Sequence, residues 1–395
     1  MAFDEKTGLP EPMARALNTR SWYAHAIAFV DVKWAQSSAK HRIGIAETMA
    51  TVTPALFGAY RPTKRSGPSS TAGAFNKARR DAGPPPEHLA SAVRWLESHT
   101  VDSNALTDAA LVRKVLDTLA LRMDGRAAAP AMVNRKRAVF SGCLKYAVEL
   151  RLLDFHPLTL VSWTAPKNSD QVDRRSVVNP EQARRLLAEV PKIAPELEAF
   201  FSCMYYAALR PEEVLALRDD EYERTKKKGG WGTPHLTGSI VAVGKDWGAQ
   251  YGSAAHRGLK HQAASATRDV PAAPVLCTLL ETHIKEYPPS TSGRIFVTRR
   301  GSGGRSVPTA GQPIPNNTYT TVFRKAREAA MTPAQLRSPL ARVPYQLRHA
   351  CVSLWLNAAV PATLVAEWAG HSVYALLKIY ASCIYGRREN STAAY

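Results

Sequence analysis

The sequence predicts a mainly α protein, with an all-helical N-terminal domain and a mostly helical α+β domain that contains a small antiparallel sheet. Apolar residues recur at helical spacing along most of the 395 residues. Strand-like runs occur only in the middle of the chain, at 239–244 and 267–271. A chain of this length exceeds one ordinary hydrophobic core, so two domains are expected.

The N-terminal domain is expected to cover 20–157, after a short leader at 1–19. Apolar residues recur at helical spacing in several stretches, and no strand signal is found among them. A stretch at 61–86, rich in Pro, Gly, Ser and positive charge, is expected to be a basic connector. The predicted helices cover 22–33, 43–52, 87–98, 107–123 and 131–151.

The segment 158–178 is predicted to be the interdomain linker, because it has little periodicity and a charged stretch. The second domain is expected to span 179–386, with a C-terminal tail at 387–395. It starts with Asn179-Pro180-Glu181, which has the N-cap, the first-turn proline and the first-turn acid of a helix.

The second domain is predicted to be helical around a small antiparallel sheet. The strand-like runs at 239–244 and 267–271 bracket a long connection rich in Gly and Lys, which indicates a hairpin with a long loop. Further helices are predicted at 197–206, 212–218, 273–287, 318–330, 347–358, 361–368 and 375–383.

The charge of the chain indicates a polyanionic partner. Lysine and arginine number 52 against 33 acidic residues, which leaves a net charge of +19. A field of that sign attracts polyanions, so nucleic acid is the expected partner. No apolar run approaches the length of a membrane span, and the N-terminus has no signal pattern. A cytoplasmic protein without membrane contact is expected, associated with the nucleoid when bound to DNA.

The cysteines indicate a reducing environment. They are scattered, odd in number and without metal-ligand spacing, so we expect packed, reduced thiols and no structural zinc. These residues are Cys143, Cys203, Cys277, Cys351 and Cys383.

Three segments carry residues suited to phosphate chemistry. Arg210 lies in Ala208-Leu-Arg-Pro-Glu-Glu-Val, Arg348 lies in Tyr345-Gln-Leu-Arg-His349, and Tyr380 follows the histidine of Gly370-His371-Ser372 by nine residues. The planar fork of arginine binds two phosphate oxygens at once, and a tyrosine can attack phosphorus and store the bond covalently.

In this order, over 179–386, the motifs resemble those of the tyrosine recombinases, the integrases of phages and mobile elements. The resemblance implies the DNA breaking-rejoining enzyme fold, with 20–157 as a core-binding, SAM-like domain. It also implies site-specific DNA recombination, as integration or excision, through a 3'-phosphotyrosyl intermediate. The implied partners are double-stranded DNA attachment sites, three further protomers in a tetramer on DNA, and an accessory directionality or bending factor. No metal or nucleotide cofactor is expected.

The resemblance also assigns roles to individual residues. Arg210 and Arg348 would bind the non-bridging oxygens of the scissile phosphate. Glu213 would orient Arg210, and His371 would support proton movement and hydrogen-bond the phosphate. Tyr380 would be the nucleophile.

The leaving 5'-oxygen needs a proton, which the family supplies from a lysine on a β-hairpin. Lys260 is the candidate for this general acid, and Lys245 is the alternative. Tyr345 occupies the position that most family members fill with histidine, and a phenol donates one hydrogen bond but is no neutral base near pH 7. Its role is left open, and His349 is expected to be structural.

Other interpretations stay open at this point. Tyr374 and Tyr385 are nearby tyrosines, but they follow His371 by three and fourteen residues and do not match the family spacing. A type IB topoisomerase-like enzyme would share the chemistry and relax supercoils as a monomer. A non-catalytic DNA-binding protein on the same scaffold is the alternative that Tyr345 suggests. The Gly-His-Ser-to-Tyr spacing and the helical first domain favour a recombinase.

Overall fold

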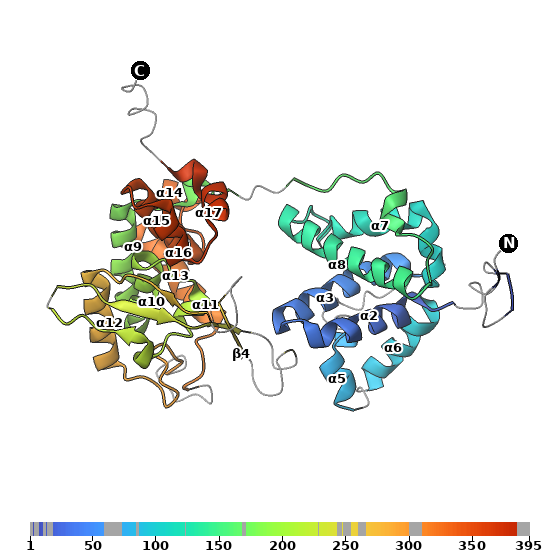
Figure 1. Cartoon of the computed structure of the whole chain (residues 1–395), viewed down its shortest axis with the longest axis horizontal. Helices are drawn as coiled ribbons and strands as arrows, with labels where there is room; N and C mark the ends of the chain where they lie inside the picture. The colour runs from blue at the N-terminus through green and yellow to red at the C-terminus, as the bar shows by residue number, and fades with distance from the viewer. Residues whose placement is uncertain are drawn as a thin grey trace, which may run out of the picture. The chain divides into compact units, whose positions relative to one another are not determined.

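The computed structural model describes residues 3, 8–10, 13, 19–58, 73–83, 87–122, 124–167, 171–227, 229–242, 247, 254–259, 266–299 and 310–384. The chain divides into two compact units (Figure 1). The first consists of Met1–Asn168 with Val243–Ser253, and the second of Ser169–Ala242 with Ala254–Tyr395.

The described part of the first unit is a helical bundle without strands. Its core contains Trp22 and Phe140, whose rings meet edge to face at 6.0 Å between centroids. Ser21 caps the first helix by accepting a hydrogen bond from the Ala24 amide. The elements are α2 (Trp22–Gln36), α3 (Ala39–Val52), η1 (Thr53–Leu56), α5 (Lys77–Asp81), α6 (Glu87–His99), η2 (Ser103–Thr107), α7 (Ala109–Leu119), α8 (Pro130–Glu149) and η3 (Pro157–Leu160).

The second unit is also mostly helical. Its first long helix begins as predicted, because Asn179 and Gln182 form a reciprocal capping box ahead of it. The helical elements are η4 (Arg174–Ser176), α9 (Pro180–Ile193), η5 (Pro195–Leu197), α10 (Glu198–Tyr206), α11 (Pro211–Val214), η6 (Asp219–Glu221), α12 (Pro274–Glu286), α13 (Asn316–Ala330), α14 (Pro333–Arg337), α15 (Tyr345–Asn357), α16 (Ala362–Ala369), α17 (Val373–Tyr380) and η8 (Ala381–Cys383).

The strands of the second unit are short and antiparallel. A three-stranded sheet has the order β1 (Tyr222–Glu223), β2 (Thr233–Leu236), β5 (Arg268–Asp269). A separate hairpin pairs β3 (Ser239–Ala242) with β4 (Ala254–Arg257). The predicted fold class, mainly helical with a small antiparallel sheet, is therefore confirmed.

The predicted hairpin was wrong in its pairing. The run at 267–271 supplies β5, but β5 pairs with β2, and β3 pairs with β4 from inside the expected loop. Ala-Ala-His-Arg of β4 has no β-branched residue, so its sequence gives no strand signal.

Two apolar clusters hold the second unit together. The larger one surrounds α10, where Phe200 and Phe201 pack against Phe323 and its neighbours. The smaller one joins α15, α16 and α17 and includes Tyr380 and Cys351. The second cluster fixes the end of α17 against α15, which positions the candidate site.

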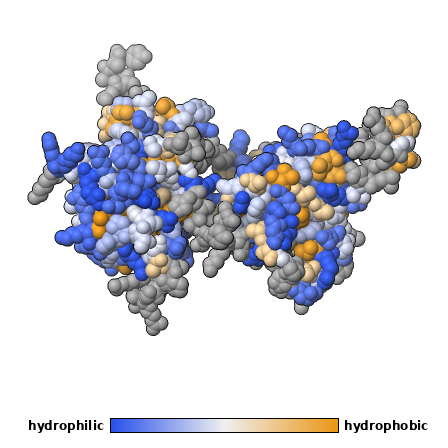
Figure 2. All heavy atoms as spheres, turned by 60° about the horizontal axis from the view of Figure 1, so that its bottom comes forward, coloured by the Kyte–Doolittle hydropathy of each residue, from blue (hydrophilic) through white to orange (hydrophobic). Residues whose placement is uncertain are grey.

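The visible surface of both units is largely hydrophilic, with scattered apolar residues (Figure 2). Among the described residues, no helix combines the length and the apolar character that crossing a bilayer requires.

Candidate active site

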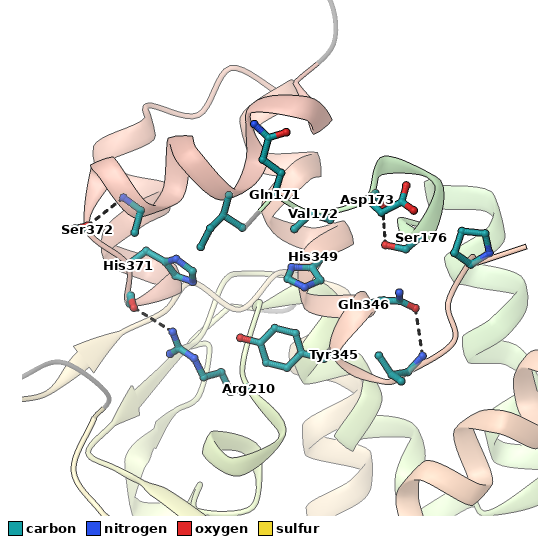
Figure 3. A pocket seen from close by; sticks show the side chains of 15 residues that line it. Gln171, Val172, Asp173, Ser176, Arg210, Tyr345, Gln346, His349, His371 and Ser372 are labelled. Carbon is teal, nitrogen blue, oxygen red and sulfur yellow. Dashed lines mark hydrogen bonds between the residues drawn. The ribbon is translucent and has the colours of Figure 1, made fainter. Parts of the chain in front are cut away.

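Side chains from several elements of the second unit converge on one site (Figure 3). Helix α15 carries Tyr345, Arg348 and His349, and Tyr380 is the last residue of α17. A cavity of about 1060 Å³ lies beside them, and its lining includes Arg210 and Tyr345. His349 and His371 also line it.

The turn between α16 and α17 depends on Gly370. This residue ends α16 in the left-handed conformation, with φ 60° and ψ 51°. A Cβ atom here would clash with the guanidinium of Arg268. The backbone amide of His371 donates a hydrogen bond to the Ala366 carbonyl at 2.8 Å. The turn therefore fixes the backbone position of His371.

Glu213 is the buried anion of the site, with 1% of its surface exposed. One carboxylate oxygen accepts from Arg210 Nη1 at 2.6 Å, and the other accepts from Arg268 Nη2 at 2.8 Å. Arg348 Nη1 lies 3.9 Å from the same carboxylate. Burial alone would raise the pKa of Glu213, but the three arginines lower it to about 2.

The arginine cluster therefore has an excess of positive charge. Three guanidinium groups face the single carboxylate of Glu213, so two positive charges remain without an anion among these groups. Charges held away from water are costly unless they are paired. The cluster is thus suited to bind an anion that carries several oxygens, such as a phosphodiester.

Arg348 is fully buried, and it does not line the cavity. Its guanidinium donates hydrogen bonds to the carbonyl oxygens of Ala208 and Ala369. Its Nε atom is buried without a hydrogen-bond partner among the described residues.

Tyr380 is also fully buried. Its hydroxyl lies 2.7 Å from Nδ1 of His349, within hydrogen-bonding distance. Burial raises the pKa of Tyr380 above its ordinary value, although Arg348 and Arg210 act in the opposite direction. The phenol is therefore protonated at neutral pH in the free protein.

The ring of His371 also lies near Tyr380, with 6.2 Å between ring centroids. Its Nε2 atom is buried and has no hydrogen-bond partner within the described part of the chain. Burial lowers the pKa of His371 to about 3, and the nearby charges of Arg348 and Arg210 act in the same direction. The ring is thus neutral and can hydrogen-bond a ligand in the cavity.

Tyr345 lines the cavity together with Arg210. Its phenol is a hydrogen-bonding neighbour of the Arg210 guanidinium, toward which it points in Figure 3. Its ring meets that of His349 at 5.0 Å between centroids. Tyr345 therefore adds a polar contact to Arg210.

Comparisons with known proteins place this site on a known fold. No family model and no curated protein matches the sequence. The XerH site-specific recombinase, in a post-cleavage complex with a palindromic difH substrate, matches with a TM-score of 0.54 and 14% identity, over 94% of each chain. The Tn1549 transposon integrase, in complex with transposon right end DNA, matches with a TM-score of 0.53 and 12% identity, over 80% of this chain and 96% of that one. A lambda integrase dimer bound to a COC' core site matches with a TM-score of 0.52 and 10% identity, over 91% of this chain and 78% of that one.

The chain has the tyrosine recombinase fold. The resemblance that the motifs indicated thus holds for the architecture of most of the chain. On the recombinase fold, Arg210 and His371 line the cavity, whereas Arg348 and Tyr380 are buried beside them.

The proposed lysines are not placed by the structure. Lys260 and Lys245 both lie outside the described residues, and so does Tyr385. Tyr374 is 77% exposed on α17 and is not part of the lining of the cavity.

Two residues of the candidate site have contacts that the sequence did not reveal. Arg268 was predicted only as part of a strand, and its ion pair with Glu213 joins segments 55 residues apart. The signal that could have drawn notice was the spacing of two between Arg268 and the apolar Val270, which puts both on the same face of an extended segment. His349 was expected to be structural, yet it contacts the Tyr380 hydroxyl across 31 residues.

Proposed function

We propose that this protein is a tyrosine-type site-specific recombinase, which cleaves and rejoins double-stranded DNA to integrate or excise a mobile element. The observation that carries the proposal is the buried hydroxyl of Tyr380 within the field of Arg348 and Arg210, in a cluster with excess positive charge. A nucleophile and an anion site are thus combined on a recombinase fold.

The proposed chemistry proceeds without an external energy source. Tyr380 attacks the scissile phosphate, forms a 3'-phosphotyrosyl bond and releases a 5'-hydroxyl. Arg210 and Arg348 bind the non-bridging oxygens, on which negative charge builds up. His371 hydrogen-bonds the phosphate, and Lys260, or Lys245 in its place, protonates the leaving oxygen. Attack by the 5'-hydroxyl of another strand reverses the step and rejoins the DNA.

The proposed organisation follows the sequence. Residues 20–157 form the core-binding domain, 158–178 the linker and 179–386 the catalytic domain, between a leader at 1–19 and a tail at 387–395. The net charge of +19 favours binding to DNA phosphates. Because recombination joins two duplexes, each cut on two strands, we expect four protomers on DNA, with an accessory directionality or bending factor.

The test is covalent capture of DNA by the full chain. Nicked duplexes tiled across the DNA that flanks the gene are incubated with the protein, so that the short fragment released by cleavage diffuses away. We expect a denaturant-resistant protein–DNA adduct on a particular tile, and none with Tyr380→Phe. If no tile yields an adduct with the wild-type chain, the proposal fails.

The same experiment separates the alternatives. Adducts on duplexes of any sequence, together with relaxation of supercoiled plasmid by the monomer, would identify a type IB topoisomerase-like enzyme. Sequence-specific binding without any adduct would identify a non-catalytic DNA-binding protein. An adduct that persists in Tyr380→Phe would transfer the role of nucleophile to another residue.

A further inference from the structure

We propose that His349 is the proton acceptor for the nucleophile: its Nδ1 atom takes the hydroxyl proton of Tyr380 as the phenol oxygen attacks phosphorus. The inference rests on the proposed strand-cleavage function. It assigns a catalytic role to a residue that the motifs left as structural.

Geometry carries the assignment. The Tyr380 hydroxyl and His349 Nδ1 are 2.7 Å apart, and the two rings meet at 62° with 5.5 Å between centroids. No other described side chain hydrogen-bonds to this hydroxyl. A general base must lie within hydrogen-bonding distance of the proton that it removes, and His349 meets this condition before DNA is bound.

The other groups nearby are less suited to accept the proton. Tyr345 is a phenol, which is no base near neutral pH. The Glu213 carboxylate accepts hydrogen bonds from Arg210 and Arg268. The ring of His371 lies close to Tyr380 but makes no hydrogen bond with it among the described contacts.

The protonation states agree with this role. Burial, with a smaller effect of Arg348, lowers the pKa of His349 to about 4, so the imidazole is neutral and has a lone pair on one nitrogen. The role requires the tautomer in which the ring hydrogen of His349 lies on Nε2, so that the Nδ1 lone pair accepts the hydrogen bond from Tyr380. The lowered pKa of His349 and the raised pKa of Tyr380 together keep the proton on the phenol in the free protein.

Phosphate binding changes this balance. His349 lines the cavity beside Arg210, so a phosphodiester bound there places negative charge near the imidazole. A nearby opposite charge favours the protonated form of histidine. Proton transfer to His349 is thus expected only when DNA occupies the site.

The step balances in protons and bonds. The O–H bond of Tyr380 breaks and its proton moves to Nδ1 of His349, while the phenol oxygen forms the bond to phosphorus. The bond from phosphorus to the 5'-oxygen breaks, and that oxygen takes a proton from a lysine ammonium. In the rejoining step, the imidazolium of His349 returns its proton to the departing oxygen of Tyr380.

The experiment measures single-turnover adduct formation on the nicked duplex that the wild type cleaves. His349→Asn is the main variant, because an amide oxygen can replace the hydrogen bond from Tyr380 but cannot take its proton. We expect adduct formation to slow by a factor of about 10²–10⁴ with duplex affinity unchanged. His283→Asn is the matched control, since His283 is also buried with a lowered pKa but lies outside the cavity. It should cleave at the wild-type rate.

A second measurement separates proton transfer from positioning. Replacing Tyr380 by a trifluorotyrosine makes the phenol more acidic and reduces its need for a base. The loss caused by His349→Asn should therefore shrink at least tenfold in the fluorinated protein. An equally large loss of rate in the fluorinated protein would overturn the assignment. So would a rate of adduct formation in His349→Asn within about threefold of the wild-type rate, because removing a general base usually has a much larger effect.

A third variant covers a failure of His349→Asn to fold. In His349→Ala, added imidazole should reach the vacated position through the cavity and restore adduct formation, and more basic imidazoles should restore it further. Absence of rescue at saturating imidazole would count against the inference. Loss of adduct in the wild type would instead refute the proposed function itself, so the two failures are distinguishable.

Discussion

Glu213 is the residue around which the arginines of the site are arranged. Its carboxylate contacts Arg210 from the start of its own helix and Arg268 from strand β5, and it lies near Arg348 of α15. A single side chain thus links three elements that are far apart in the sequence.

The proposed role of Arg210 in cleavage can be tested separately from DNA binding. Arg210→Ala should slow adduct formation by a factor on the order of hundreds, because the guanidinium acts mainly on charge that develops in the transition state. Duplex affinity, measured by fluorescence anisotropy, should change little. Arg218→Ala is the control, since Arg218 pairs with Asp220 on the surface. Equal losses of binding and cleavage in Arg210→Ala would make this residue a DNA anchor only.

Arg268 is expected to stabilise the fold through its buried ion pair. Arg268→Met removes a charge-assisted hydrogen bond of 2.8 Å to Glu213, whereas the ion pair of Glu213 with Arg210 remains, so the free energy of unfolding should fall by about 2 kcal/mol. Urea unfolding followed by tryptophan fluorescence measures this change. Arg324→Met breaks an exposed pair with Glu328 and should cost less than about 1 kcal/mol. Similar losses in the two variants would contradict the prediction.

At the scale of elements, the turn after α16 sets the distance between the arginine cluster and α17. Gly370 adopts a positive φ there, and its Cα faces the guanidinium groups of Arg268 and Arg210. The turn therefore has both a backbone requirement and a steric one.

Gly370→Ala tests the two requirements together. The left-handed conformation costs an alanine roughly 1–2 kcal/mol, and the clash with Arg268 adds to it. Gly311→Ala is the matched control, because Gly311 has φ +78° but nothing within 4 Å of an added Cβ. Thermal unfolding should show a larger loss for Gly370→Ala, accompanied by slower adduct formation. Equal losses would show that only the backbone conformation matters.

The sequence predicted the helices better than the contacts between residues that are far apart in the chain. Helix α8 and the capped start of α9 follow from apolar spacing and an Asn-Pro-Glu start, which are local signals. Strand β4 has no such signal, and the pairing of β5 with β2 joins residues that are far apart in the sequence, such as His235 and Asp269. The contact between His349 and Tyr380 depends on how α15 packs against α17, which periodicity does not describe. The ordered motifs indicated Arg210, Arg348 and Tyr380, whereas Arg268 required the fold.

At the scale of the whole molecule, buried histidines in both units make stability depend on pH. Burial lowers the pKa of His25 in the first unit. It lowers the pKa of His283 and His349 to about 4 and that of His371 to about 3, against about 6.5 in an unfolded chain. Below pH 6.5 the unfolded chain binds more protons than the folded one, so the free energy of unfolding falls as the pH drops.

Glu213 acts in the same direction at lower pH. Its pKa of about 2 in the folded protein lies below the ordinary value of 4.5, so its stabilising effect is lost as the pH falls through that range. The melting temperature should be constant between pH 8 and 7 and should fall below about pH 6.5. His283→Phe should make this decline shallower. A melting temperature that rises on acidification would contradict the prediction.

The unbalanced arginines around Glu213 also have a practical consequence for handling the protein. The proposed phosphodiester site should also accept small oxyanions, so phosphate and sulfate in a buffer should compete with DNA for it. Preparations stored in phosphate should look more stable and react more slowly than those in chloride. Activity is therefore best compared between variants in buffers without multivalent oxyanions.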